Sequence, residues 1–133
     1  MAIHDTAVST FVIDSWEATP FDEQEGATLT RTRVTKTFHG DIAGTSTAEL
    51  LMAQTQEGSA AYVGFERISC SLHGRSGSFV LHHNATMTRD ESSASWTVLP
   101  DSGTGELSGL RGEAQITQSP DGGHTFTLTY DLP

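Results

Sequence analysis

The chain has 133 residues and a mass of 14.2 kDa, which suits one compact domain over residues 1–133. Its formal net charge of −10 argues against binding to nucleic acid or to an anionic membrane, and no apolar stretch approaches the roughly 20 residues that span a bilayer. A single cysteine excludes an internal disulfide, and residues 1–6 lack the basic and apolar regions of a secretory signal, so we expect a cytoplasmic protein.

Turn residues and threonines predict an all-β domain. The chain contains 19 Thr, whose branched Cβ favours strands, and clusters of Gly, Asp, Asn and Ser recur between segments of alternating apolar and polar residues. No segment has a sustained apolar stripe at helical spacing. Residues 47–54 are the best helical candidate, but Ala48, Leu50 and Met52 also alternate, so we predict a strand there.

Alternation assigns one face of each predicted strand to the interior. Residues 8–16 are apolar on both faces, so the register of this first strand stays open. The next predicted strands are residues 28–38, 47–54 and 60–72, with inner sets Val34, Lys36 and Phe38; Ala48, Leu50 and Met52; and Tyr62, Glu66, Ile68, Cys70 and Leu72. Residues 78–88, 93–98, 112–117 and 125–131 follow, with inner sets Phe79, Leu81, His83 and Met87; Trp96 and Val98; Ala114 and Ile116; and Phe126, Leu128 and Tyr130.

About eight strands with one apolar face each predict a small closed antiparallel β-barrel, because closure removes the exposed edges of an open sheet. A sandwich with Greek-key connections is the alternative, and chain length does not separate the two. Val63 and Phe65 fall on the outer face of a strand whose inner face is already apolar. Outer apolar residues often pack against a partner, so we expect a homo-oligomer, with a dimer favoured.

Several polar or amphipathic side chains also fall on the predicted inner face: Lys36, Tyr62, Glu66, His83 and Tyr130. A carboxylate and an imidazole in an apolar interior suit proton transfer, with a tyrosine able to donate to a substrate oxygen. Alternatively, a Glu66–Lys36 ion pair or a bond from Glu66 to a tyrosine would simply satisfy the core. We predict no metal site, because adjacent His82 and His83 point to opposite faces of a regular strand.

Four stretches of the sequence carry a family resemblance: residues 34–42 (VTKTFHGDI), 62–67 (YVGFER), 74–81 (GRSGSFVL) and 103–112 (GTGELSGLRG). In this order, from about the first strand to the last, they resemble a bacterial domain-of-unknown-function family, number 3224. That family looks like a member of the allene-oxide-cyclase-like barrels, small antiparallel barrels that often assemble as oligomers. Residues 103–112 are similar to a glycine-punctuated segment of those barrels, whose glycines would let the chain bend sharply and pack close to its neighbour.

The resemblance implies a fold more directly than a chemistry. Plant allene oxide cyclases bind an oxylipin in the barrel and guide its ring closure largely by shape, with a carboxylate and an ordered water. The corresponding hypothesis here is a cyclase or isomerase, without a cofactor or metal, that acts on an apolar small molecule. Glu66 and His83 would be catalytic, and the ligand-binding residues would be Lys36, Phe38, Met52, Tyr62, Phe79, Met87, Trp96, Phe126 and Tyr130.

Two alternatives stay open: a small-molecule-binding barrel without catalysis, and a barrel filled by its own side chains that acts only through its surface. An interior cavity of about 300 Å³ or more would retain the two ligand hypotheses. Between these two, a buried Glu66 carboxyl with a raised pKa favours catalysis, whereas a salt-bridged Glu66 favours binding or packing.

Overall fold

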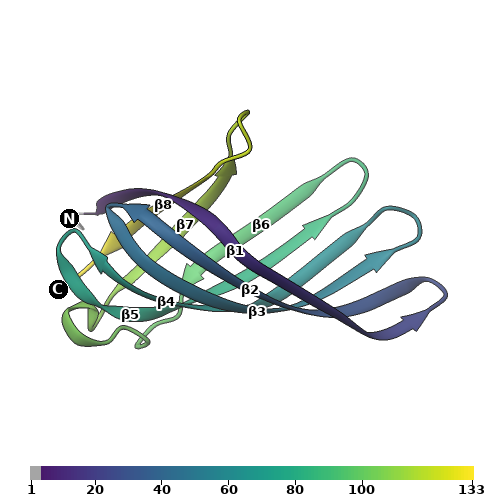
Figure 1. Ribbon diagram of the computed structural model, residues 1–133, viewed down its shortest axis with the longest axis horizontal. Helices are drawn as coiled ribbons and strands as arrows, with labels where there is room; N and C mark the ends of the chain where they lie inside the picture. The colour runs from purple at the N-terminus through teal and green to yellow at the C-terminus, as the bar shows by residue number, and fades with distance from the viewer. Residues whose placement is uncertain (1–3) are drawn as a thin grey trace.

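The computed structural model describes residues 4–133, which form eight antiparallel strands that close into one barrel (Figure 1). Each strand pairs with its neighbours along the chain, and the last pairs with the first, so the closed barrel is confirmed over the sandwich. Residues 1–3, part of the segment in which we looked for a secretory signal, lie outside the described residues. The strands are β1 (Asp5–Gln24), β2 (Ala27–Gly40), β3 (Ile42–Thr55), β4 (Ala60–Leu72), β5 (Arg75–Met87), β6 (Ser92–Val98), β7 (Arg111–Gln118) and β8 (His124–Asp131).

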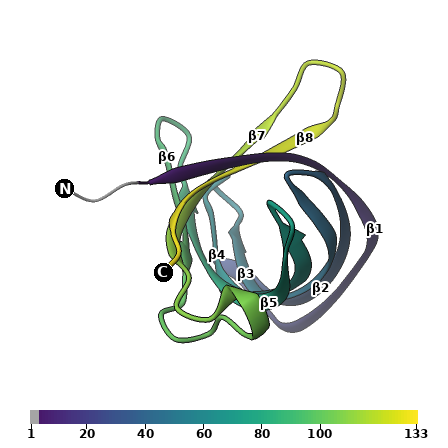
Figure 2. The same ribbon diagram turned by 90° about the vertical axis from the view of Figure 1, so that its left-hand side faces the viewer.

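Turns connect most consecutive strands, and the longest connection, residues 99–110, joins β6 to β7 through a 3-10 turn, η1 (Gly105–Leu107). Seen from one end, the strands curve around a central space, and the β7–β8 hairpin projects to one side (Figure 2). The ambiguous segment 47–54 lies within β3, which confirms the strand prediction. Within residues 4–133, no helix has the length and apolar character needed to cross a membrane.

The predicted inner faces of β2 to β8 agree with the observed burial except at Met87 near the end of β5, which is exposed. β1 contains an irregularity that alternation could not reveal. Its first half buries Ala7 and Phe11, but the pairing with β2 shifts between Ile13 and Ser15. Beyond this β-bulge Trp16 lies opposite the inward-facing Val34, so the inner face passes from odd to even positions. The bulge therefore places Ile13 and Trp16 on the same inner face, whereas Val8 and Val12 are exposed on the outer face.

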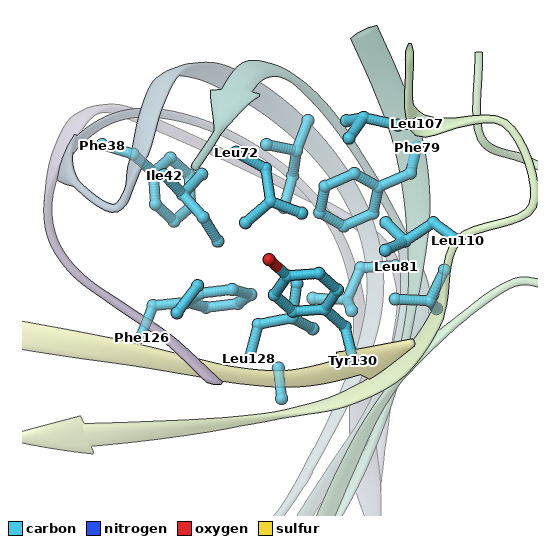
Figure 3. Packing of buried hydrophobic residues seen from close by; sticks show 14 of the residues in the cluster. Phe38, Ile42, Leu72, Phe79, Leu81, Leu107, Leu110, Phe126, Leu128 and Tyr130 are labelled. Carbon is cyan, nitrogen blue, oxygen red and sulfur yellow. The ribbon is translucent and has the colours of Figure 1, made fainter. Parts of the chain in front are cut away.

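The end of the barrel at which β1 begins and β8 ends (Figure 1) is packed with large apolar side chains (Figure 3). Leu107 and Leu110, from the connection that contains η1, are fully buried against it. That connection approaches β5 closely, since a Cβ at Gly77 would lie 2.1 Å from the carbonyl oxygen of Thr104, and Gly105 has a φ of +59°. The side chains labelled in Figure 3 are Phe38, Ile42, Leu72, Phe79, Leu81, Leu107, Leu110, Phe126, Leu128 and Tyr130.

The opposite end is open, because the wall of the barrel separates along two seams. The pairing of β1 with β8 ends at Phe11 and His124, although β1 continues to Gln24 alongside β2. β6 pairs with β7 only through Trp96–Ala114 and Thr97–Glu113 within the described residues. The β1–β2, β3–β4 and β5–β6 hairpins therefore extend past the closed part of the barrel and diverge (Figure 1).

Candidate functional site

Two adjoining cavities occupy the open half of the barrel. The inner cavity has a volume of about 170 Å³, and the wider mouth has a volume of about 460 Å³. Met52, Tyr62 and Trp96 line both, so these three side chains mark the passage from one to the other. The inner walls are largely apolar and include Phe11, Ile13, Trp16, Val34, Ala48, Leu50 and Ile116.

A charged cluster separates the inner cavity from the packed end. Glu66 on β4 is completely buried, and its Oε1 accepts hydrogen bonds from His83 Nε2 at 2.8 Å and from Lys36 Nζ at 3.2 Å. Its Oε2 accepts a hydrogen bond from the Ser46 hydroxyl at 2.5 Å. Lys36 and His83 line the inner cavity, and Glu66 lies behind them. The carboxylate therefore holds two cavity-lining side chains in place.

The hydrogen bond from His83 and the charge of Lys36 decide the protonation state of Glu66. Burial alone would raise the pKa of this carboxyl, but the hydrogen bond from His83 and the charge of Lys36 outweigh burial. The net effect lowers the pKa of Glu66 from 4.5 to about 2, so the group is ionised at neutral pH. Because a carboxylate only accepts hydrogen bonds, the proton between Glu66 and His83 belongs to Nε2 of the imidazole.

Three aromatic side chains of the cavity, Phe11, Tyr62 and Trp96, take part in polar interactions. The Lys36 ammonium lies 4.6 Å from the centre of the Phe11 ring, a cation–π contact. Burial raises the pKa of the Tyr62 hydroxyl, so this hydroxyl stays protonated and can donate. The nearby Trp96 indole partly offsets that rise, although the two groups do not meet in hydrogen-bond geometry.

The structure divides the sequence-predicted site residues into three groups. Lys36, Met52, Tyr62, His83 and Trp96 line the inner cavity, and Met87 lines the mouth, where it is exposed. Glu66 lies directly behind the inner cavity. The remaining four lie in the packed end and line neither cavity: Phe38, Phe79, Phe126 and Tyr130. The Tyr130 hydroxyl is hydrogen-bonded to His73 Nδ1 at 2.5 Å, which accounts for its polar group.

Several contributors to the site were absent from the sequence-based set, and Ser46 and Trp16 show two reasons. Ser46 shares the parity of Ala48 and Leu50, so extending the predicted strand by one residue toward the N-terminus would have placed it inside. Trp16 lines the inner cavity only because of the bulge after Ile13, which no simple alternation predicts.

Adjacent His82 and His83 point to opposite faces of β5, as predicted. His83 is buried in the cluster, whereas His82 is exposed and stacks on Phe65 with ring centres 5.3 Å apart. Among the described residues, no group of three or more His, Cys, Asp or Glu side chains is placed to hold a metal ion.

Together, the fold and the site define a small antiparallel β-barrel with a packed end and a hollow end. The chain belongs to the family described as "Protein of unknown function (DUF3224)", whose pattern matches residues 7–130. It is similar to a protein of unknown function from the DUF3224 family from Shewanella oneidensis MR-1, with 33% sequence identity over 98% of this chain and 99% of that chain. The two folds superpose with a TM-score of 0.84. No curated protein matches the chain.

Proposed function

We propose that this protein binds a small, largely apolar molecule in the open half of its barrel. The observation that carries this proposal is the pair of adjoining cavities, because the mouth alone lies within the range of about 300–1,000 Å³ typical of ligand pockets. An eight-stranded barrel can be filled by its own side chains, as the packed end is, and the open end is not filled in this way.

The charged cluster supports binding without catalysis as the first candidate function. Glu66 is ionised and already accepts hydrogen bonds from Lys36, His83 and Ser46. A carboxyl with a lowered pKa and three partners is a poor proton donor at neutral pH. Its role in this proposal is to fix the orientation of the cavity-lining Lys36 and His83.

Binding is testable with N-phenyl-1-naphthylamine, a neutral dye whose fluorescence rises in apolar surroundings. Ala85 lines the mouth, whereas its neighbour Asn84 is exposed on the outer face of the same strand. We expect saturable dye binding that Ala85→Trp weakens by about tenfold or more, because the indole fills the mouth, while Asn84→Trp leaves it unchanged. Absence of saturable binding, or equal binding by both variants, would exclude the open half as the site.

A second candidate, the cofactor-free cyclase or isomerase that the resemblance to allene-oxide-cyclase-like barrels implies, is favoured by one specific feature. Glu66 holds the proton of His83 on Nε2, which leaves Nδ1 of the neutral ring as a base in an apolar cavity. In this candidate His83 accepts the proton, and Glu66 is a positioning residue that stabilises the imidazolium.

The base can be tested without knowing the substrate. In 5-nitrobenzisoxazole, loss of the C3 proton to a base breaks the ring N–O bond and releases a coloured phenolate. If His83 is a base, the protein should accelerate this ring opening at neutral pH by about a hundredfold, and His83→Phe should abolish the acceleration. An equal rate for His83→Phe and the unchanged protein would remove catalysis by His83 from consideration.

A further inference from the structure

Two buried nitrogen atoms in the inner cavity lack a hydrogen-bond partner within residues 4–133: His83 Nδ1 and Trp96 Nε1. Both side chains line the inner cavity, and His83 is only 3% exposed. The two residues lie directly opposite each other in the β5–β6 register, where side chains on one face have Cβ atoms about 5 Å apart. An unpaired buried polar group is costly, so such an adjacent pair calls for a common partner.

The two nitrogen atoms have opposite hydrogen-bonding character. The His83 proton lies on Nε2, against the Glu66 carboxylate, and the Lys36 ammonium already balances that carboxylate's charge. In the neutral ring the other nitrogen, Nδ1, carries no proton and accepts a hydrogen bond. The indole Nε1 of Trp96 can only donate. A single hydroxyl group, which donates once and accepts, complements both nitrogen atoms.

The size and polarity of the inner cavity restrict what can carry that hydroxyl. A volume of about 170 Å³ resembles that of the engineered apolar cavity of about 150 Å³ that binds benzene. The surrounding side chains, including Phe11, Val34 and Ile116, offer apolar contacts for a ring. A negatively charged head group is disfavoured, because the Lys36 ammonium is already paired with Glu66.

We propose that the ligand class of this site is a neutral, ring-containing alcohol or phenol. Its hydroxyl donates to His83 Nδ1 and accepts from Trp96 Nε1, and its ring fills the inner cavity. Any larger apolar part extends through the passage at Met52 and Tyr62 into the mouth. This inference rests on the proposed binding function and adds the polar group that the bound molecule must present.

The test compares three compounds of similar size: phenol donates and accepts, anisole only accepts, and toluene does neither. Binding is measured by calorimetry, together with the Trp96 indole N–H proton resonance, which Trp16→Phe distinguishes from that of the other tryptophan. We expect phenol to bind at least about tenfold more tightly than toluene or anisole, although toluene is the more hydrophobic compound. Phenol alone should shift the Trp96 N–H resonance strongly downfield.

Variants assign the preference to the two nitrogen atoms. Trp96→Phe should reduce the preference for phenol by about tenfold and leave toluene binding within about twofold. His83→Phe should also reduce the preference for phenol. If His83→Phe does not fold, because Glu66 has lost its hydrogen-bond partner, Trp96→Phe alone decides the test. Ser95→Ala is the matched control, since it removes an exposed hydroxyl beside Trp96 on β6 and should retain the preference.

The outcomes separate this inference from the function on which it rests. If N-phenyl-1-naphthylamine binds but the three compounds bind equally, or not at all, the hydroxyl inference is overturned and the binding function stands. This result would also follow if a water molecule permanently satisfied both nitrogen atoms. If neither the dye nor any of the three compounds binds, both proposals fail. A preference for phenol that survives Trp96→Phe likewise overturns the role of Trp96 Nε1.

Discussion

The packed end and the hollow end of the barrel are built from the same strands, but their inner faces are filled differently. β5 contributes Phe79 and Leu81 to the packed end, and then His83, Ala85 and Met87 to the hollow end. The connection that contains η1 covers the first group, whereas the seams beside β1 and β6 leave the second group open. One strand can therefore contribute stability at one end and a binding surface at the other, because neither end must do both.

The charged cluster lies at the boundary between these two regions. Glu66 is placed where the large apolar side chains stop, and its partners Lys36 and His83 face the cavity. A buried ion pair contributes little net stability compared with apolar packing, and removing one partner is costly. Its position indicates that it defines the floor of the cavity and does not drive folding.

The largest expected change in stability comes from truncating one side chain in the packed end, compared with one in the hollow end. Phe79 is fully buried in the packed end, so Phe79→Ala should lower the free energy of unfolding by about 4 kcal/mol. Met52 lines the cavities and is partly exposed, so Met52→Ala should cost only about 1 kcal/mol. Urea denaturation with linear extrapolation measures both losses. Equal losses would mean that the open half is packed in solution.

The second prediction tests the boundary between the two ends. Glu66→Gln keeps the shape of the side chain but leaves the buried Lys36 ammonium without its counter-charge, so we expect a loss of about 3 kcal/mol. The double variant Lys36→Met, Glu66→Gln should recover most of this loss, because it removes the unpaired charge as well. Additive effects of the two substitutions in urea denaturation would show that Lys36 and Glu66 are not coupled.

The third prediction concerns pH. The folded-state pKa of Glu66, about 2, lies below the ordinary value of 4.5, so its ionisation stabilises the folded protein above pH 4.5. This stabilisation should disappear as the pH falls from about 4.5 to 2, with a loss on the order of 2–3 kcal/mol.

The double variant Lys36→Met, Glu66→Gln is the control for this pH dependence. Other carboxyls also titrate in this range; for example, a hydrogen bond from the Val8 backbone N–H lowers the pKa of Asp41. Because these groups are common to both proteins, the difference in unfolding free energy between them isolates Glu66. Parallel stability curves from pH 2 to 6 would contradict an ionised Glu66 in the cluster.

The fold was largely predictable from sequence, because side-chain orientation along a regular strand repeats every two residues. Alternation correctly placed Lys36, Glu66 and His83 inside, and the burial in the structure agrees. It failed to fix the register of β1, where the bulge after Ile13 moves the inner face from odd to even positions. A bulge changes the count by one residue and leaves no clear signal in composition.

The extent of the candidate site was less predictable. Alternation assigns residues to the inside but gives no position along the barrel axis, so Phe38 and Met52 are equivalent inner residues in the sequence. In the structure Phe38 packs in the closed end and Met52 lines the cavities. The difference arises from strand length, stagger and the point where pairing stops, and these are properties of the assembled barrel.

The smallest expected effect on the fold comes from the outer wall. Leu51 and Val63 are exposed cross-strand neighbours, and Phe65 lies two residues along β4 on the same face. The sequence-based expectation of a homo-oligomer, with a dimer favoured, depends on such outward apolar residues.

The double variant Val63→Thr, Phe65→Ser tests this expectation. It should change the unfolding free energy of the isolated protomer by less than about 0.5 kcal/mol. It should also lower the mass measured by light scattering to 14.2 kDa, the mass of one chain. Val8→Thr, an exposed change on β1, is the matched control and should leave the mass unchanged. A mass of 14.2 kDa for the unchanged protein at high concentration would contradict self-association and leave the cavity as the molecule's principal candidate for binding.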